Sequence, residues 1–234
     1  MDFTYQQIAK MIDHSLLRPT LTDAELEQGC RIALEHDVAS VCIVPYYLKR
    51  SAEILAGSTV RASTTIGFPH GGHTTAVKVA EAEQALADGG QELDVVVNIS
   101  KVLSGDWDYV RAELRSIIQL THAQGQQVKV IFENCYLNDE QKIRLCAISG
   151  ELGADWVKTS TGFGTGGATD HDLRLMRRHA PPQVQIKAAG GVRTLERLLE
   201  VRALGVTRVG ATQTVAILEA CRQRLAEAMG GGPG

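Results

Sequence analysis

The chain has 234 residues, of which 44% are hydrophobic and 22% are charged, and its formal net charge is −3. This balance is typical of a soluble globular protein, and it offers no excess of basic residues that would favour nucleic acid or anionic lipid as a partner. No apolar stretch reaches the roughly 18 residues that a membrane-spanning helix needs, and the first residues lack the pattern of a signal peptide, so we expect a cytoplasmic protein without membrane contact.

Short runs rich in β-branched residues alternate along the chain with amphipathic helical stretches. The predicted strands cover residues 11–15, 38–45, 60–67, 92–99, 127–134, 155–162, 184–191 and 207–211. The predicted helices cover residues 22–35, a short stretch ending near 55, and residues 75–88, 107–123, 139–152, 171–178, 195–204 and 214–229. A capping box at Thr22 and Glu25 marks the start of the first of these helices.

Eight strands that alternate with helices predict an α/β protein with a parallel sheet covered by its helices. An open, doubly wound sheet that binds a dinucleotide would normally carry G-x-G-x-x-G after its first strand, and this chain has none there. Eight βα units in about 230 residues fit a compact (β/α)8 TIM barrel instead. We therefore predict a single barrel domain over residues 1–229, followed by a disordered glycine-rich tail at 230–234.

Two lysines, Lys158 and Lys187, lie in the middle of apolar strands. Burial disfavours the charged form of an amine and a neighbouring cation disfavours it further, so such a pair can contain one neutral, nucleophilic amine at neutral pH. The alternative for each lysine is a separate ion pair, or a side chain that extends to solvent.

Successive strand residues alternate between the barrel interior and the helices. In the fourth strand this places Leu93, Val95 and Val97 against the helices and Asp94 in the interior. The same alternation turns Lys158 and Lys187 inward. A carboxylate and two amines in one interior predict a catalytic site.

At these residues the sequence closely resembles the deoxyribose-phosphate aldolase family, class I aldolases that join acetaldehyde to glyceraldehyde 3-phosphate and split the product. The resemblance covers essentially the whole chain. It is carried by IDHSLLRPT at residue 12, VCIVP at 41, IGFPHG at 66, ELDVVVNI at 92, WVKTSTGFG at 156 and IKAAGGVRT at 186. It implies that Lys158 forms a Schiff base, that Lys187 perturbs the Lys158 amine, and that Asp94 works with Lys187.

The resemblance also implies a set of substrate-binding positions. Asp13 would lie near the substrate hydroxyl groups, while Cys42 lies close to the site as a packing residue. A phosphate is expected at the loops after the seventh and eighth strands. The remaining substrate-binding candidates are Gly162, Gly190, Gly191, Gly210 and Thr212. Gln213 stands where the family usually has a serine-rich turn, so it either narrows the phosphate pocket or marks a different or unphosphorylated substrate.

The family resemblance implies phosphosugar and aldehyde substrates, no cofactor, no metal, and a homo-oligomer of two or more chains. The chain has no C-terminal tyrosine of the kind that assists proton transfer in some members. A metal-dependent aldolase is an alternative, because His70 and His73 flank a glycine pair after the third strand; it needs a third ligand, and His14 has the opposite orientation to Asp13. A non-catalytic binding module is the other alternative, but it would have no physical reason to keep three charged residues buried.

The five cysteines are widely spaced and contain no C-x-x-C pair, which argues against a disulfide framework and against a thiolate zinc site. We expect them to be reduced and mostly buried. They are Cys30, Cys42, Cys135, Cys146 and Cys221.

Overall fold

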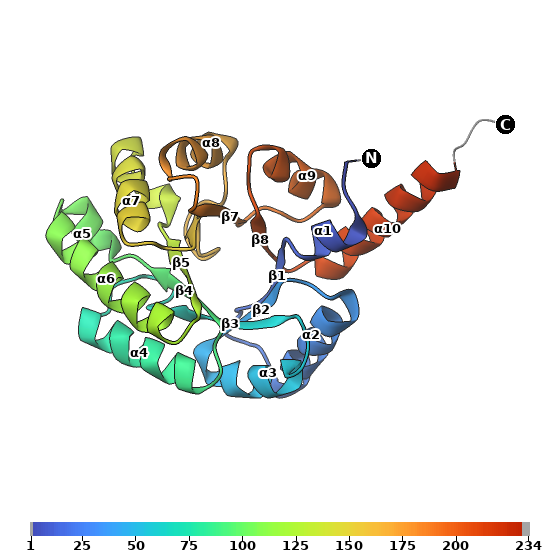
Figure 1. The fold of residues 1–234 in the computed structure, drawn as a ribbon, viewed down its shortest axis with the longest axis horizontal. Helices are drawn as coiled ribbons and strands as arrows, with labels where there is room; N and C mark the ends of the chain where they lie inside the picture. Colours follow the sequence, from blue (N-terminus) through green and yellow to red (C-terminus); the bar gives the residue numbers. More distant parts are fainter. Residues whose placement is uncertain (1, 231–234) are drawn as a thin grey trace.

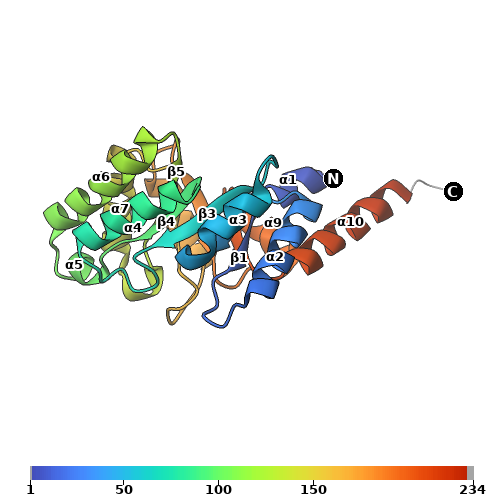
Figure 2. The ribbon, with the colours of Figure 1, turned by 90° about the horizontal axis from the view of Figure 1, so that it is seen from below.

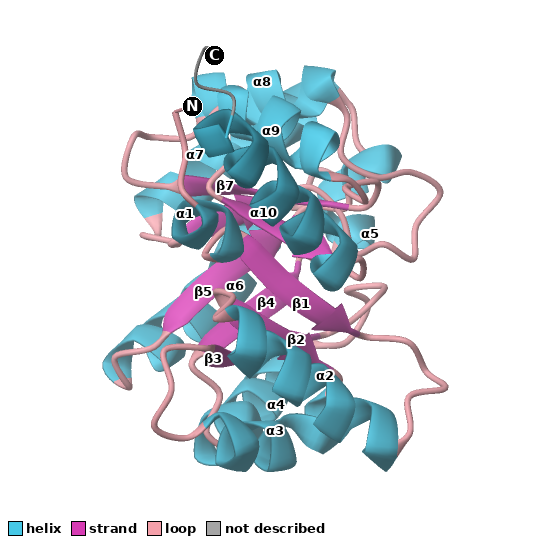
Figure 3. Cartoon of the chain, turned by 90° about the vertical axis from the view of Figure 1, so that its right-hand side faces the viewer, coloured by secondary structure: helices cyan, strands magenta, loops and turns pink. Residues whose placement is uncertain are grey.

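Eight parallel strands close into a barrel in the order in which they occur along the chain, which confirms the predicted (β/α)8 fold. The structure is a computed structural model that describes residues 2–230. The strands are β1 (Ile12–Leu16), β2 (Ser40–Ile43), β3 (Arg61–Ile66), β4 (Glu92–Val96), β5 (Gln127–Ile131), β6 (Trp156–Lys158), β7 (Gln185–Ala189) and β8 (Arg208–Ala211). Figure 1 shows the helices arranged around these strands, and Figure 3 shows the strands at the centre with helices on opposite sides.

The helices lie close to their predicted positions. They are α1 (Tyr5–Ala9), α2 (Asp23–His36), α3 (Leu48–Leu55), α4 (Thr75–Ala87), α5 (Ile99–Leu103), α6 (Trp107–Ala123), α7 (Asp139–Glu151), α8 (Asp170–His179), α9 (Leu195–Ala203) and α10 (Thr214–Gly230), with short 3-10 turns at Pro45–Tyr47 and Asn134–Tyr136. The capping box predicted at Thr22 is formed in full. No helix within residues 2–230 is long and apolar enough to cross a membrane.

Helices α1 and α5 were not predicted, because five residues are too few for an apolar periodicity to show. Helix α1 begins with its own capping box at Thr4 and packs against α10. The far end of α10 projects away from the barrel in two perpendicular views (Figures 1 and 2). The predicted glycine-rich tail lies outside the described residues from 231 onward, and Gly230 is the last residue of α10.

Most strands are shorter than the apolar runs that predicted them. The sixth run, for example, covers residues 155–162, but β6 ends at Lys158. The Thr159 amide still donates to the carbonyl oxygen of Lys187 on β7, whereas the Thr161 amide donates to the side chain of Glu133. The backbone therefore leaves the regular ladder within three residues of the lysine.

The hydrophobic core lies between the sheet and the helices. Leu93, Val95 and Val97 are fully buried in this layer, as the alternation in the fourth strand predicted. The alternate strand positions fill the barrel interior, and several of them are charged: Asp13, Asp94, Lys129 and Lys187 are all buried and are linked by ion pairs. Apolar packing and buried charge thus occupy opposite faces of the same strands.

Candidate active site

The two strand lysines are direct neighbours. Lys158 on β6 pairs in register with Lys187 on β7, and both side chains point into the barrel. They are 2% and 1% exposed, respectively, so neither amine extends to solvent. The alternative of side chains that reach bulk water is therefore excluded for both lysines.

Asp94 joins the two amines. Its Oδ2 atom lies 2.7 Å from the Nζ atom of Lys158 and 2.7 Å from the Nζ atom of Lys187. Its Oδ1 atom accepts a hydrogen bond of 2.9 Å from Lys129, a lysine of β5 that the sequence analysis did not select. One fully buried carboxylate is therefore shared by three amines.

Burial and charge separate the protonation states of these groups. Burial lowers the pKa of the Lys158 amine, Asp94 opposes this effect, and the positive charge of Lys187 lowers the pKa further. The carboxylates of Asp13 and Asp94 more than offset the effect of burial on Lys187, so its pKa lies well above the ordinary value. Although burial acts in the opposite direction, the three lysines hold the pKa of Asp94 well below its usual range. Lys158 is thus the amine that loses its proton most readily.

Asp13 on β1 lies in the interior, which is the condition for the role that the family resemblance implies for it. Its carboxylate is 2.6 Å from Lys187 and 2.9 Å from Arg208, and it accepts a hydrogen bond of 2.7 Å from Ser40. Asp13 does not line the cavity described below, and its direct partners are these two cations and the Ser40 hydroxyl. Cys42 is also buried at the site, where burial and the nearby Asp94 raise the pKa of its thiol. A protonated thiol fits the packing role expected of Cys42.

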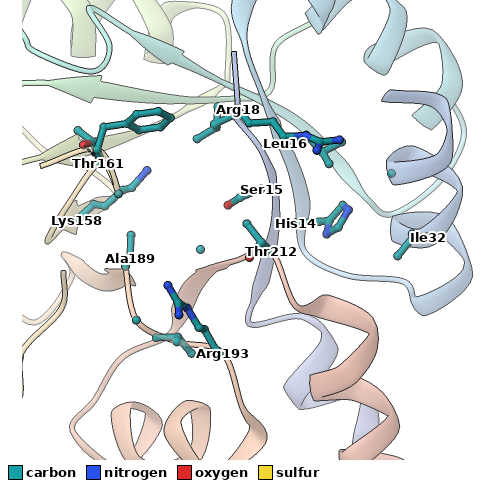
Figure 4. A pocket seen from close by; sticks show the side chains of 18 of the residues that line it. His14, Ser15, Leu16, Arg18, Ile32, Lys158, Thr161, Ala189, Arg193 and Thr212 are labelled. Atoms are coloured by element: carbon teal, nitrogen blue, oxygen red, sulfur yellow. Dashed lines mark hydrogen bonds between the residues drawn. The ribbon is translucent and has the colours of Figure 1, made fainter. Parts of the chain in front are cut away.

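A cavity of about 600 Å³ opens above Lys158 at the carboxyl ends of the strands. Five of the predicted substrate-binding residues line it: Gly162, Gly190, Gly191, Gly210 and Thr212. Figure 4 shows the Lys158 amine and the Arg193 guanidinium both extending into this space. The cavity thus connects the reactive amine to the loops where a phosphate was expected.

Backbone geometry at the glycine pair explains why side chains are absent there. Gly190 has a φ of 80°, and a Cβ atom on it would lie 2.8 Å from the Cα atom of Gly167. Gly191 has a φ of 94°, which L-residues with side chains rarely adopt. Backbone N–H groups can therefore approach a ligand closely at this end of the cavity, next to Arg193.

The expectation that Gln213 narrows the phosphate pocket is wrong. Gln213 is exposed and is not among the residues that line the cavity, whereas its neighbour Thr212 is. The reason is local: Gln213 lies at the start of α10, where its carbonyl oxygen accepts from the Ile217 amide. The bulk of its side chain therefore leaves the cavity unchanged.

The three histidines of the metal alternative form no common cluster of potential metal ligands within residues 2–230. His70 and His73 are both exposed. His14 lines the cavity, and its Nδ1 atom lies 2.8 Å from the hydroxyl of Thr214 on α10. Within residues 2–230, the one group of three potential ligands is Asp139, His171 and Asp172, which lies between α7 and α8 and is already paired with Lys142.

Sequence reasoning missed several residues of the site. Lys129 has the same inward orientation on its strand as Lys158, so the alternation argument could have identified it. Glu133 carries no such signal: it is buried with a φ of 56°, accepts a hydrogen bond of 3.1 Å from the Thr161 amide, and is bonded to the Thr161 hydroxyl. Arg193 could have been suspected as a cation two residues after the glycine pair.

A closed parallel barrel with a buried lysine of lowered pKa beneath a cavity has the architecture of a barrel aldolase. The family model described as DeoC/LacD family aldolase matches residues 7–218, and the chain belongs to this family. The resemblance identified in the sequence is thereby confirmed.

Three relatives illustrate the similarity. Deoxyribose-phosphate aldolase of Rhodopirellula baltica is 66% identical over 96% of this chain and 93% of its own length. The enzyme of the same name from Thermococcus gammatolerans is 45% identical over 92% of this chain and 96% of its own. The tetrameric deoxyribose phosphate aldolase of Aeropyrum pernix superposes with a TM-score of 0.87 at 30% identity and covers 94% of this chain and 93% of its own.

Proposed function

We propose that this aldolase reversibly cleaves 2-deoxy-D-ribose 5-phosphate to acetaldehyde and D-glyceraldehyde 3-phosphate through a Schiff base on Lys158. The observation that carries this proposal is the position of Lys158: a buried amine with a lowered pKa lies beneath the cavity and shares a carboxylate oxygen with a second, cationic lysine. The proposed substrate is taken from the names of the relatives, and the proposed mechanism is based on the geometry of the site.

The reaction begins with the neutral Lys158 amine, which attacks the aldehyde carbon of the open-chain sugar. Loss of water from the resulting carbinolamine gives an iminium ion. The hydroxyl group on C3 then gives up its proton, and the bond between C2 and C3 breaks, which releases D-glyceraldehyde 3-phosphate. The electron pair of the broken bond moves into the iminium and forms an enamine. Protonation of the enamine and hydrolysis release acetaldehyde and restore the amine. Since the iminium is the electron sink, the chemistry needs no cofactor.

Asp94 and Lys187 have different parts in these steps. Asp94 is held ionised by three amines, so it orients the Lys158 amine and stabilises the iminium by charge. Lys187 maintains the positive charge that keeps Lys158 neutral before the attack. A water molecule beside Asp94 would carry the protons.

The phosphate end of the substrate is proposed to bind at the far wall of the cavity. Gly190, Gly191 and Gly210 offer close backbone approach, Thr212 offers a hydroxyl, and Arg193 offers a positive charge. Asp13 would act through Lys187 without touching the substrate, given its position below the cavity. Gly162 and Cys42 are proposed to lie beside the Lys158 amine.

The wider biological setting is also part of the proposal. We place the chain in the cytoplasm, in the degradation of deoxyribonucleotides and carbohydrates, as one catalytic domain over residues 1–229. A homo-oligomer is supported by the tetrameric relative from Aeropyrum pernix.

Borohydride reduction in the presence of acetaldehyde tests the mechanism. We expect a covalent adduct on Lys158, detected by peptide mass spectrometry. Lys158→Met should abolish both the adduct and the activity, whereas Lys142→Met, which removes a buried lysine outside the barrel interior, should retain both. Full activity of Lys158→Met, or loss of wild-type activity with a chelator, would refute the Schiff-base mechanism.

The alternative to this proposal is a related Schiff-base aldolase that acts on an unphosphorylated sugar. Arg193 at the cavity wall favours the phosphorylated substrate. Comparison of 2-deoxyribose 5-phosphate with 2-deoxyribose decides between them: equal kcat/KM for the two sugars would show that the phosphate is not recognised.

A further inference from the structure

Below Lys158, six buried charged residues form a closed ring across the barrel interior. Three are carboxylates and three are cations, and they come from five different strands. We call this set the ionic ring: Asp13, Glu92, Asp94, Lys129, Lys187 and Arg208.

Each cation of the ionic ring bridges two carboxylates. Lys129 lies 2.5 Å from Glu92 and 2.9 Å from Asp94. Lys187 lies 2.7 Å from Asp94 and 2.6 Å from Asp13. Arg208 closes the ring, 2.9 Å from Asp13 and 2.5 Å from Glu92. Positive and negative groups therefore alternate without a gap.

Lys158 stands outside this alternation. It contacts one carboxylate of the ring, Asp94, at an oxygen atom that Lys187 already contacts. The ring has equal numbers of carboxylates and cations, so the interior is electrically neutral only when Lys158 has no charge. A seventh charge in this water-poor space has no counter-ion of its own.

We infer that Lys129 and Glu92 are positioning residues for the Schiff-base step, which hold Lys158 neutral by completing the charge balance of the ionic ring. The inference deepens the proposed function and rests on it. Neither residue lines the cavity, so neither touches the substrate. Both act on Lys158 through Asp94 and through the field of the ring.

Other charged groups near Lys158 do not alter this balance. From β2 the thiol of Cys42 approaches, and burial raises its pKa so that it stays uncharged. From β3 the inward residues Ser63 and Thr65 carry no charge. Arg61 reaches Glu92 at 3.8 Å, but its side chain is 44% exposed, so solvent screens its charge. Glu133 lies above the strands, where it is bonded to Thr161, and within residues 2–230 it forms no ion pair with Lys158 or with the ionic ring.

The two positioning residues have opposite charges, so their removal must act in opposite directions. Lys129→Met leaves three carboxylates and two cations, and the protonated form of Lys158 then restores neutrality, so its pKa rises. Glu92→Gln leaves two carboxylates and three cations, which repel a further proton, so the pKa of Lys158 falls. A merely structural role for either residue would lower activity without this difference in sign.

The experiment measures the rate of acetaldehyde trapping by cyanoborohydride as a function of pH, with the Lys158 adduct quantified by mass spectrometry. Because only the neutral amine attacks, the trapping rate rises as pH increases through the pKa of Lys158. We expect this acidic limb to move by about one pH unit or more toward higher pH in Lys129→Met, and toward lower pH in Glu92→Gln.

Two further variants complete the design. Lys129→Arg keeps the charge and should leave the limb near its wild-type position, and Lys142→Met removes an ion pair between α7 and α8 and should also leave it there. If Lys129→Met does not fold, Glu92→Gln still tests the ring proposal, because glutamine has nearly the same shape as glutamate. If the acidic limbs of the pH profiles of Lys129→Met and Glu92→Gln stay in place or move in the same direction, the ring proposal is overturned. A wild-type protein without any Lys158 adduct would overturn the proposed function instead.

Discussion

Replacement of Lys187 by methionine isolates the electrostatic contribution of the second lysine. The amines of Lys158 and Lys187 each lie 2.7 Å from the same oxygen atom of Asp94, so they are at most twice that distance, about 5.4 Å, apart. With an effective dielectric constant of about 20, two unit charges at this separation repel by about 3 kcal/mol. This energy corresponds to a pKa shift of about two units.

Lys187→Met should therefore raise the pKa of Lys158 by about two units. The loss of one cation beside Asp94 acts in the same direction, because the charge of Asp94 then stabilises the protonated form of Lys158 more strongly. At neutral pH the neutral fraction of Lys158, and with it kcat/KM, should fall by up to about 100-fold. Kinetics from pH 6 to pH 10 provide the assay, since the lost activity should return as the pH rises through the new pKa. A loss that is constant with pH would refute the electrostatic role, and an unchanged activity would refute any role of Lys187.

Three other predictions concern the rest of the molecule. Arg193→Ala should raise KM for the phosphorylated sugar by about tenfold and leave kinetics with 2-deoxyribose unchanged, because a charge-assisted hydrogen bond contributes about 1.5 to 3 kcal/mol; steady-state kinetics with both sugars check this. Lys78→Met should lower the free energy of unfolding by about 3 to 5 kcal/mol in urea titrations, because it leaves the fully buried carboxylate of Glu113 without its partner at 2.8 Å. Iodoacetamide should label Cys135 in the native protein and leave Cys146 unlabelled, because Cys135 is exposed while burial raises the pKa of Cys146 to about 12; peptide mapping before and after unfolding distinguishes the two.

The fold and the central residues could be predicted because they depend on local patterns. Strand alternation alone predicted that Asp94, Lys158 and Lys187 point inward, and the structure places both lysine amines within hydrogen-bond distance of Asp94. The periodicity of the strands and helices likewise predicted the barrel, since eight βα units leave few other topologies.

The rest depended on relations between distant segments. The path of the chain after β6 involves a hydrogen bond between Thr161 and Glu133, which lie in segments after different strands. The strained backbone of Glu133 gives no signal in the sequence, because its left-handed φ of 56° is imposed by the surrounding structure. Alternation along β5 gives the inward orientation of Lys129, but its contact with Asp94 depends on the shear of the barrel, which the sequence does not reveal.

The division of each strand into an apolar outer face and a charged inner face has a consequence for mutational tolerance. Residues such as Leu93 and Val95 pack in the core between the sheet and the helices, while Asp94 between them faces the lysines of the proposed active site. Stability and reactivity are therefore encoded at alternating positions of one segment, and each set can change while the other stays fixed. Laboratory evolution of this chain could thus raise its melting temperature through the outer positions while the chemistry of the inner ones is preserved.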